Sequence, residues 1–141
     1  MRAFQWTRAY SVYVAEVDAE HRTIFRLAHG LHQATAGGAA WRKVQPLLRE
    51  LVAHTAGHLS HEEHVMRSTG YPLYEWHTRQ HNVARAKISH LDLRIRRGDR
   101  ESVPVLLDYL AGWLENHIRL ADRMLGAYLR NRERAEAALA S

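Results

Sequence analysis

Apolar residues recur at intervals of three and four along four long stretches of the chain, which is the spacing of helices that bury one face. In the first stretch this spacing runs through Ile24, Leu27 and Leu31 and ends at Gly37 and Gly38. The other three stretches cover residues 41–68, 73–97 and 102–134. The pattern therefore predicts an all-α protein.

Several residues mark where these helices are expected to begin. Asp18 is predicted to be the N-cap of the first helix, and Pro46 to lie in the first turn of the second. Ser102 and Pro104 are predicted to open the fourth helix in a capped turn. Because the connections are short, consecutive helices should pack antiparallel as an up-down-up-down four-helix bundle.

The division into parts follows from this pattern. Residues 1–17 are predicted to form an N-terminal arm, and residues 18–141 to form the bundle with a C-terminal helical extension. Four apolar side chains offer anchors for docking the arm on the bundle, namely Trp6, Val12, Val14 and Val17.

Composition narrows the classes of function. The 141 residues fit one domain, and they include no cysteine, so any metal must be held by nitrogen and oxygen atoms. No apolar run is long enough to span a bilayer, and the N-terminus lacks the apolar region of a secretory signal. We therefore expect a cytoplasmic protein with no membrane insertion.

The formal net charge of +5 raises the question of an acidic partner. The arginines form only two local clusters, one at residues 94–97 and one at residues 130–134, and Glu133 interrupts the second. No interleaving of aromatic and basic residues accompanies them. We interpret these clusters as solvated helical ends, and we predict no nucleic-acid partner.

Every predicted helix carries a histidine or a carboxylate suited to binding metal. His58 and Glu62 are four residues apart, as are His77 and His81, so each pair projects from one face of its helix. Either pair alone is a weak signal in a chain with 11 histidines, but donors near one level on all four helices are far more specific. The candidate metal ligands are His21, His58, Glu62, His77, His81, His117 and Asp122.

The spacing of His117 and Asp122 is the least regular in this set. They are five residues apart, which on an α-helix leaves them roughly 140° out of line. Asp122 could swing inward to bridge two metals while His117 binds one of them. Alternatively, a local π-type widening of the helix could bring both side chains to one face.

Between Trp6 and about Leu129 the chain resembles the hemerythrin family, and most closely its single-domain bacterial members, the bacteriohemerythrins. The motifs that carry this resemblance are Asp18-x-x-His21, His58-x-x-x-Glu62-Glu63-x-x-Met66, Gly70-Tyr71-Pro72, His77-x-x-x-His81 and Trp113-Leu114-x-x-His117-Ile118-x-x-x-Asp122. Tyr13 departs from the family pattern, which has a small residue at that place in the arm.

The resemblance implies a centre of two non-haem iron ions with an oxo or hydroxo bridge. His77, His81 and His117 would complete the coordination of one iron, whereas His21 and His58 would hold the second and leave a position open for dioxygen. Glu62 and Asp122 would bridge the two ions.

Further side chains are expected to surround this centre. Helix spacing places Ile24, Trp113, Leu114 and Ile118 around the open position, as an apolar oxygen pocket. Two more histidines lie within one turn of His58 and are candidates to support it from behind, namely His54 and His61.

The leading hypothesis is an oxygen carrier, store or supplier that binds dioxygen reversibly and is not an enzyme. One alternative is a di-iron enzyme acting as a peroxidase, nitric oxide reductase or ferroxidase, and another is a sensing module for oxygen or nitric oxide. Nitric oxide and peroxide are therefore further candidate ligands, and an oxygen-consuming protein is a candidate partner.

Overall fold

The computed structural model describes residues 4–141, so the first three residues of the predicted arm lie outside the described range. The helices are α1 (Ala15–Ala36), α2 (Trp41–Ser68), α3 (Tyr74–Arg96), α4 (Ser102–His117) and α5 (Arg123–Ala140), with a 3-10 turn η1 (Arg8–Tyr10) and a π-helical segment η2 (Ile118–Asp122) between α4 and α5. No strand occurs in this part of the chain.

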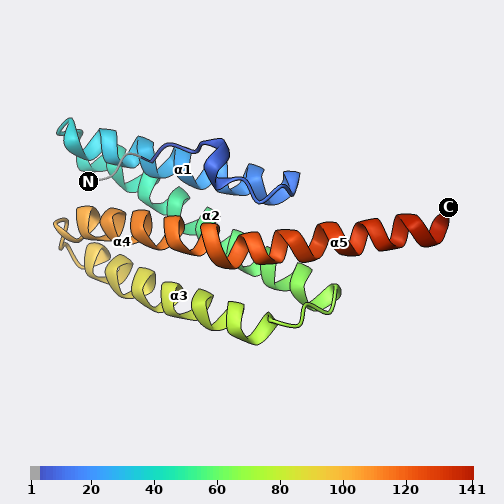
Figure 1. The fold of residues 1–141 in the computed structure, drawn as a ribbon. Helices are drawn as coiled ribbons and strands as arrows, with labels where there is room; N and C mark the ends of the chain where they lie inside the picture. The colour runs from blue at the N-terminus through green and yellow to red at the C-terminus, as the bar shows by residue number, and fades with distance from the viewer. Residues whose placement is uncertain (1–3) are drawn as a thin grey trace.

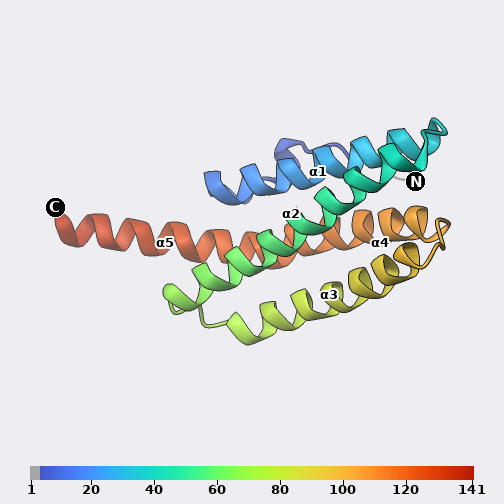
Figure 2. The ribbon, with the colours of Figure 1, turned by 180° about the vertical axis from the view of Figure 1, so that it is seen from behind.

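The helices form the predicted up-down-up-down bundle. The turns from α1 to α2 and from α3 to α4 lie at one end, and the turn from α2 to α3 lies at the other (Figure 1). Seen from behind, α2 crosses the bundle between α1 and α3, and α5 continues α4 beyond the other helices (Figure 2). The four helices of the bundle are thus α1, α2, α3 and the continuous run from α4 through η2 into α5.

Two apolar clusters stabilise the bundle. The larger one draws on α1, α2, α3, α4 and the arm, and it includes Leu31, Leu51, Leu91 and Leu107. The smaller one joins Met66, Tyr71 and Leu125 near the turn from α2 to α3.

The arm docks on the bundle through its apolar side chains. Val12 is buried in the larger cluster, and Trp6 packs against that cluster with the guanidinium of Arg22 4.1 Å from the centre of its ring. Phe4, which the sequence did not single out, is also buried there. Tyr13 has a φ of 59°, a left-handed conformation that suits a small residue better than tyrosine.

Three expectations about helix starts were wrong. α1 begins at Ala15, and Asp18 instead accepts hydrogen bonds from the Ser11 hydroxyl and the Val12 N–H at 2.6 and 2.8 Å. The side chain of Asp18 therefore holds the arm rather than the helix end. Pro46 is the sixth residue of α2, beyond its first turn.

The start of α4 also differs from the prediction. Ser102 is its first helical residue, the residue before it makes no capping hydrogen bond, and the Ser102 hydroxyl donates to Asp99 at 2.9 Å. Pro104 does lie in the first turn. The short connection before α4 is thus stabilised by Asp99 rather than by a side-chain cap.

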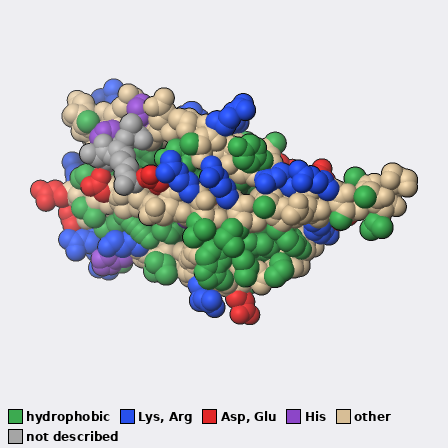
Figure 3. Space-filling model, in the orientation of Figure 1, with side chains coloured by type: hydrophobic (Ala, Val, Ile, Leu, Met, Phe, Trp, Pro, Cys, Tyr) green, Lys and Arg blue, Asp and Glu red, His purple; other side chains and the backbone are tan. Residues whose placement is uncertain are grey.

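Basic side chains on the surface lie in several separate groups (Figure 3). Three of the arginines in the predicted clusters form ion pairs with acidic neighbours, namely Arg94 with Asp99, Arg96 with Asp92 and Arg132 with Glu136. Such pairs are typical of solvated helical faces. Within residues 4–141, no helix is both long enough and apolar enough to cross a membrane.

Candidate metal centre

The seven predicted ligands come together in the interior of the bundle as two overlapping groups. One group contains Glu62, His77, His81, His117 and Asp122, and the other contains His21, His58, Glu62 and Asp122. Within each group the candidate donor atoms lie no more than 4.8 Å from one another, and all seven residues are buried. The two carboxylates belong to both groups.

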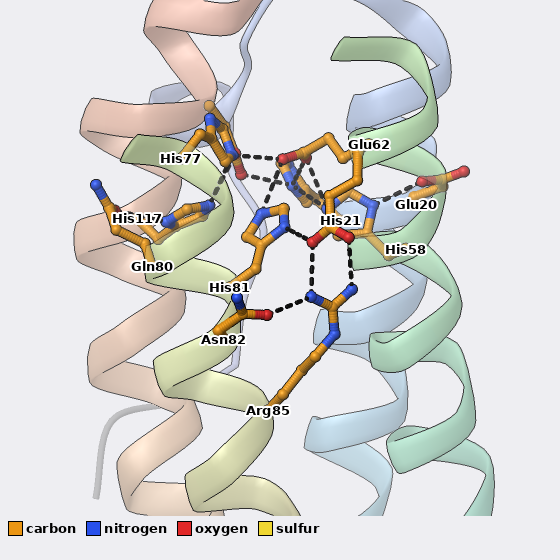
Figure 4. A network of polar contacts seen from close by, with 12 residues as sticks. Glu20, His21, His58, Glu62, His77, Gln80, His81, Asn82, Arg85 and His117 are labelled. Carbon is orange, nitrogen blue, oxygen red and sulfur yellow. Dashed lines mark hydrogen bonds and ion pairs between the residues drawn. The ribbon is translucent and has the colours of Figure 1, made fainter. Parts of the chain in front are cut away.

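The oxygens of Glu62 divide between the two groups. Oε1 lies 2.7 Å from Nε2 of His77 and 3.2 Å from Nε2 of His81. Oε2 lies 3.0 Å from Nε2 of His58 and 4.0 Å from Nε2 of His21. One carboxylate therefore faces both sets of imidazoles, one oxygen to each (Figure 4).

Asp122 is shared in the same way. Its Oδ1 lies 3.1 Å from Nε2 of both His77 and His117, and its Oδ2 lies 3.1 Å from Nε2 of His21. The two carboxylates thus span the space between the histidines of one group and those of the other.

A π-helical segment explains how His117 and Asp122 reach the same site. The segment η2 spans Ile118–Asp122, directly after His117. Its wider turn closes hydrogen bonds between residues five apart, so side chains at that spacing share a face. Of the two arrangements that the sequence left open, the structure has the π-type widening.

Several buried donor and acceptor atoms in this cluster make no regular hydrogen bond with any residue of the described chain. They are Nδ1 of His21, Nδ1 of His77, Nε2 of His81, Oε2 of Glu62 and both carboxylate oxygens of Asp122. Buried polar atoms are rarely left in this state, and cations bound in the two groups would satisfy Nε2 of His81 and the three carboxylate oxygens. The donor set of imidazoles and carboxylates suits iron, and the residues present therefore fit a metal centre.

The close contacts with the two carboxylates raise the pKa values of two candidate ligand histidines, His58 and His77. Burial alone would lower the pKa of His58, but the charge of Glu62 and the hydrogen bond to Glu20 raise it to about 10. Burial likewise opposes the effect of Asp122 and Glu62 on His77, whose pKa rises to about 9. Without metal, both imidazoles are therefore protonated at neutral pH.

The carboxylates respond in the opposite direction. Burial and the charge of Asp122 act to raise the pKa of Glu62, but His58 and His77 hold it below its ordinary value. Asp122 is likewise buried, yet His117, His21 and His77 hold its pKa well below the usual range. Both carboxylates are therefore ionised at neutral pH.

These pKa values predict proton release when the metal-free protein takes up metal. His58 and His77 must lose their protons to bind a cation, so about two protons should leave per chain near pH 7. The number should fall toward zero above pH 10, and metal affinity should rise as the pH increases up to that point. Calorimetric titration with Zn²⁺ in buffers of different ionisation enthalpy measures the release, and a value near zero at pH 7 would contradict these protonation states.

Three of the candidate ligand histidines have a hydrogen-bond partner at Nδ1, the ring nitrogen that faces away from the site. The sequence analysis did not predict these partners. Glu20 Oε1 lies 2.6 Å from Nδ1 of His58, and Gln80 Oε1 lies 3.0 Å from Nδ1 of His117. Glu63, quoted only as part of a motif, lies 2.8 Å from Nδ1 of His81. A metal-binding imidazole commonly donates the N–H of its second nitrogen to such a partner. These three partners lie on other helices than their histidines, so no local spacing reveals them.

The two histidines proposed to support His58 occupy different places. His61 Nδ1 lies 2.8 Å from Oε2 of Glu20, so it contacts the carboxylate that also holds His58. His54 lines a cleft of about 460 Å³ between α1 and α2, together with Glu20 and His58. A supporting role for His54 stays a prediction.

The side chains assigned to the oxygen pocket are placed as follows. Ile24, Leu114 and Ile118 are buried. Trp113 stacks on His117, with ring centres 4.2 Å apart and planes 13° apart, and lies 6.3 Å from the ring of His81. Trp113 thus packs against candidate ligands of the first group, whereas the open position was predicted beside His21 and His58. The role of these four residues as an oxygen pocket stays a prediction.

Fold and site together define a metal-binding four-helix-bundle protein. Residues 12–129 match the family model described as the hemerythrin HHE cation binding domain. The chain belongs to the hemerythrin family.

Named relatives agree with this assignment. A bacteriohemerythrin from Methylococcus capsulatus is 27% identical over 92% of this chain and 98% of its own length. A myohemerythrin from Sipunculus nudus is 28% identical over 84% of this chain and 88% of its own length. A crystal structure of a hemerythrin leucine-to-alanine mutant superposes with a TM-score of 0.82 at 26% identity, covering 90% of this chain and 97% of that one.

Proposed function

We propose that this protein binds dioxygen reversibly at a centre of two non-haem iron ions. The observation that carries the proposal is the pair of overlapping ligand groups that share Glu62 and Asp122. Two carboxylates with one oxygen toward each group suit a bridged pair of metal ions better than a single ion. The membership of the chain in the hemerythrin family supports iron as the metal.

The two groups suggest different roles for the two ions. His77, His81 and His117 supply three imidazoles to one ion, whereas His21 and His58 supply two to the other. The ion with fewer protein ligands would keep a position open, and the iron would supply the electrons that hold dioxygen there. An oxo or hydroxo bridge between the ions completes the proposed centre.

The residues around the site favour reversible binding of dioxygen over its chemical conversion. All seven ligands are buried, and apolar side chains of α1, α4 and η2 pack nearby, including Ile24, Leu114 and Ile118. Such packing limits the access of water and protons to the ligand, which favours its release unchanged. We therefore propose a carrier, store or supplier of dioxygen rather than an enzyme.

Exposure of the reduced, iron-loaded protein to air tests this proposal. A new visible absorption band should appear on mixing with air and disappear when oxygen is removed, over repeated cycles. Immediate oxidation with no reversible band would instead favour the di-iron enzyme alternative.

A further inference from the structure

The ligand histidines of the two groups have different partners behind them. In the first group, Nδ1 of His81 lies 2.8 Å from Glu63, whose carboxylate also receives two hydrogen bonds from Arg85 at 2.7 and 3.0 Å. Nδ1 of His117 lies 3.0 Å from the neutral side chain of Gln80. The partners on this side thus present either a compensated charge or no charge.

In the second group, the partner behind His58 is the carboxylate of Glu20, whose other side-chain hydrogen bond is also to a histidine. Glu20 lies 2.6 Å from Nδ1 of His58 through Oε1, and its Oε2 lies 2.8 Å from Nδ1 of His61 (Figure 4). Among residues 4–141, no lysine or arginine forms a hydrogen bond or an ion pair with Glu20. Its charge is therefore directed at a single ligand histidine.

The position of Glu20 makes this contact specific. It is the residue before His21 in α1, yet it reaches across to His58 in α2. Ala19, Ala53 and Gly57 line the cleft beside it. None of them has a side chain large enough to cover the carboxylate, which is about one-third exposed. Solvent weakens its long-range field, so its influence should pass mainly through the short hydrogen bond to His58.

The chemistry of such a contact is well defined. A carboxylate that accepts the Nδ1–H of a ligand imidazole fixes the tautomer with Nε2 toward the metal and raises the basicity of that nitrogen. A more basic ligand beside a negative charge stabilises the more highly charged state of a metal ion. Neither Gln80 nor the Glu63–Arg85 pair can do this to the same extent.

We propose that Glu20 is a positioning residue that fixes the tautomer of His58 and selectively stabilises the oxidised state of the iron held by His21 and His58. This inference rests on the proposed iron centre but not on dioxygen binding. The hydrogen bond that Glu20 in α1 accepts from His58 would then give the two iron positions different reduction potentials.

Two substitutions separate the charge of Glu20 from its hydrogen bond. Glu20→Gln keeps an acceptor oxygen for His58 and removes the charge, whereas Glu20→Ala removes both. Glu16→Gln is the matched control, because Glu16 is an exposed glutamate one turn earlier in α1 that makes no hydrogen bond or ion pair with a candidate ligand.

Spectroelectrochemical titration of the iron-loaded proteins without oxygen is the decisive experiment. Glu20→Gln should shift the equilibrium toward the reduced form by about tenfold, which is about 59 mV for one electron, with iron content unchanged. Glu16→Gln should leave the midpoint potential near the wild-type value. Equal potentials for Glu20→Gln and Glu16→Gln, at equal iron content, would overturn the inference.

Titration with Co²⁺ keeps the inference testable even if the chain takes up no iron. Glu20→Ala should weaken Co²⁺ binding about 10- to 100-fold relative to Glu16→Gln, because His58 loses its orienting partner. Absence of iron would count against the proposed function alone. Equal Co²⁺ affinities for the two variants would count against the role of Glu20.

Discussion

The His77→Ala variant is expected to lose most of its metal. Nε2 of His77 contacts both shared carboxylates, Glu62 at 2.7 Å and Asp122 at 3.1 Å, and the side chain is fully buried. Its removal deletes a candidate ligand and takes one imidazole partner away from each of the two buried carboxylates. Because losing only the partner behind a ligand costs 10- to 100-fold in affinity, losing the ligand itself should cost more than about 100-fold.

Metal analysis after dialysis against a mild chelator checks this expectation. His117→Ala should behave in the same way, since His117 belongs to the same ligand group. His90→Ala is the control, because His90 is an exposed histidine of α3 outside both groups. Wild-type iron content in His77→Ala would show that this residue is not a ligand.

The second large effect is expected at Leu114, which is buried one turn before His117. Leu114→Ala should lower the free energy of unfolding by about 2–5 kcal/mol, as truncation of a buried leucine leaves a cavity. If Leu114 also shields bound dioxygen from water, autoxidation should become faster while iron content stays the same. Denaturant unfolding and the decay of the oxygenated spectrum measure the two effects.

A surface substitution far from the centre serves as the control for Leu114. Arg132 is exposed on α5 and pairs only with Glu136 among the described residues, so Arg132→Gln should change neither stability nor autoxidation appreciably. Identical autoxidation rates in the wild type and Leu114→Ala, with iron retained in both, would show that Leu114 only fills the core.

The sequence predicted the helices well because their apolar periodicity records which faces are buried. The sequence also predicted that the seven candidate ligands would meet inside the bundle, because each of the four helices carries at least one of them. The sequence could not choose between an inward swing of Asp122 and a π-type segment at residues 118–122. The conformation of this segment depends on how it packs against the other helices, which carry His21 and His77, two partners of Asp122.

Features that depend on contacts between distant residues were missed or misread. Asp18 looks like an N-cap in a local reading, yet its carboxylate binds the arm through Ser11 and Val12. Glu20 carries no local signal, because its partner His58 lies 38 residues away on α2. Tyr13 is the one non-glycine residue with positive φ in the described chain, a conformation that the sequence analysis did not predict.

We propose that two iron ions share Glu62 and Asp122 and bind dioxygen reversibly. The most direct test of this proposal is the simultaneous measurement of iron content and dioxygen uptake on the reduced protein, followed by release under argon. We expect two irons per chain and one dioxygen bound per two irons, with all of the bound dioxygen released unchanged under argon. One metal ion per chain, or consumption of dioxygen without its release, would contradict the proposal.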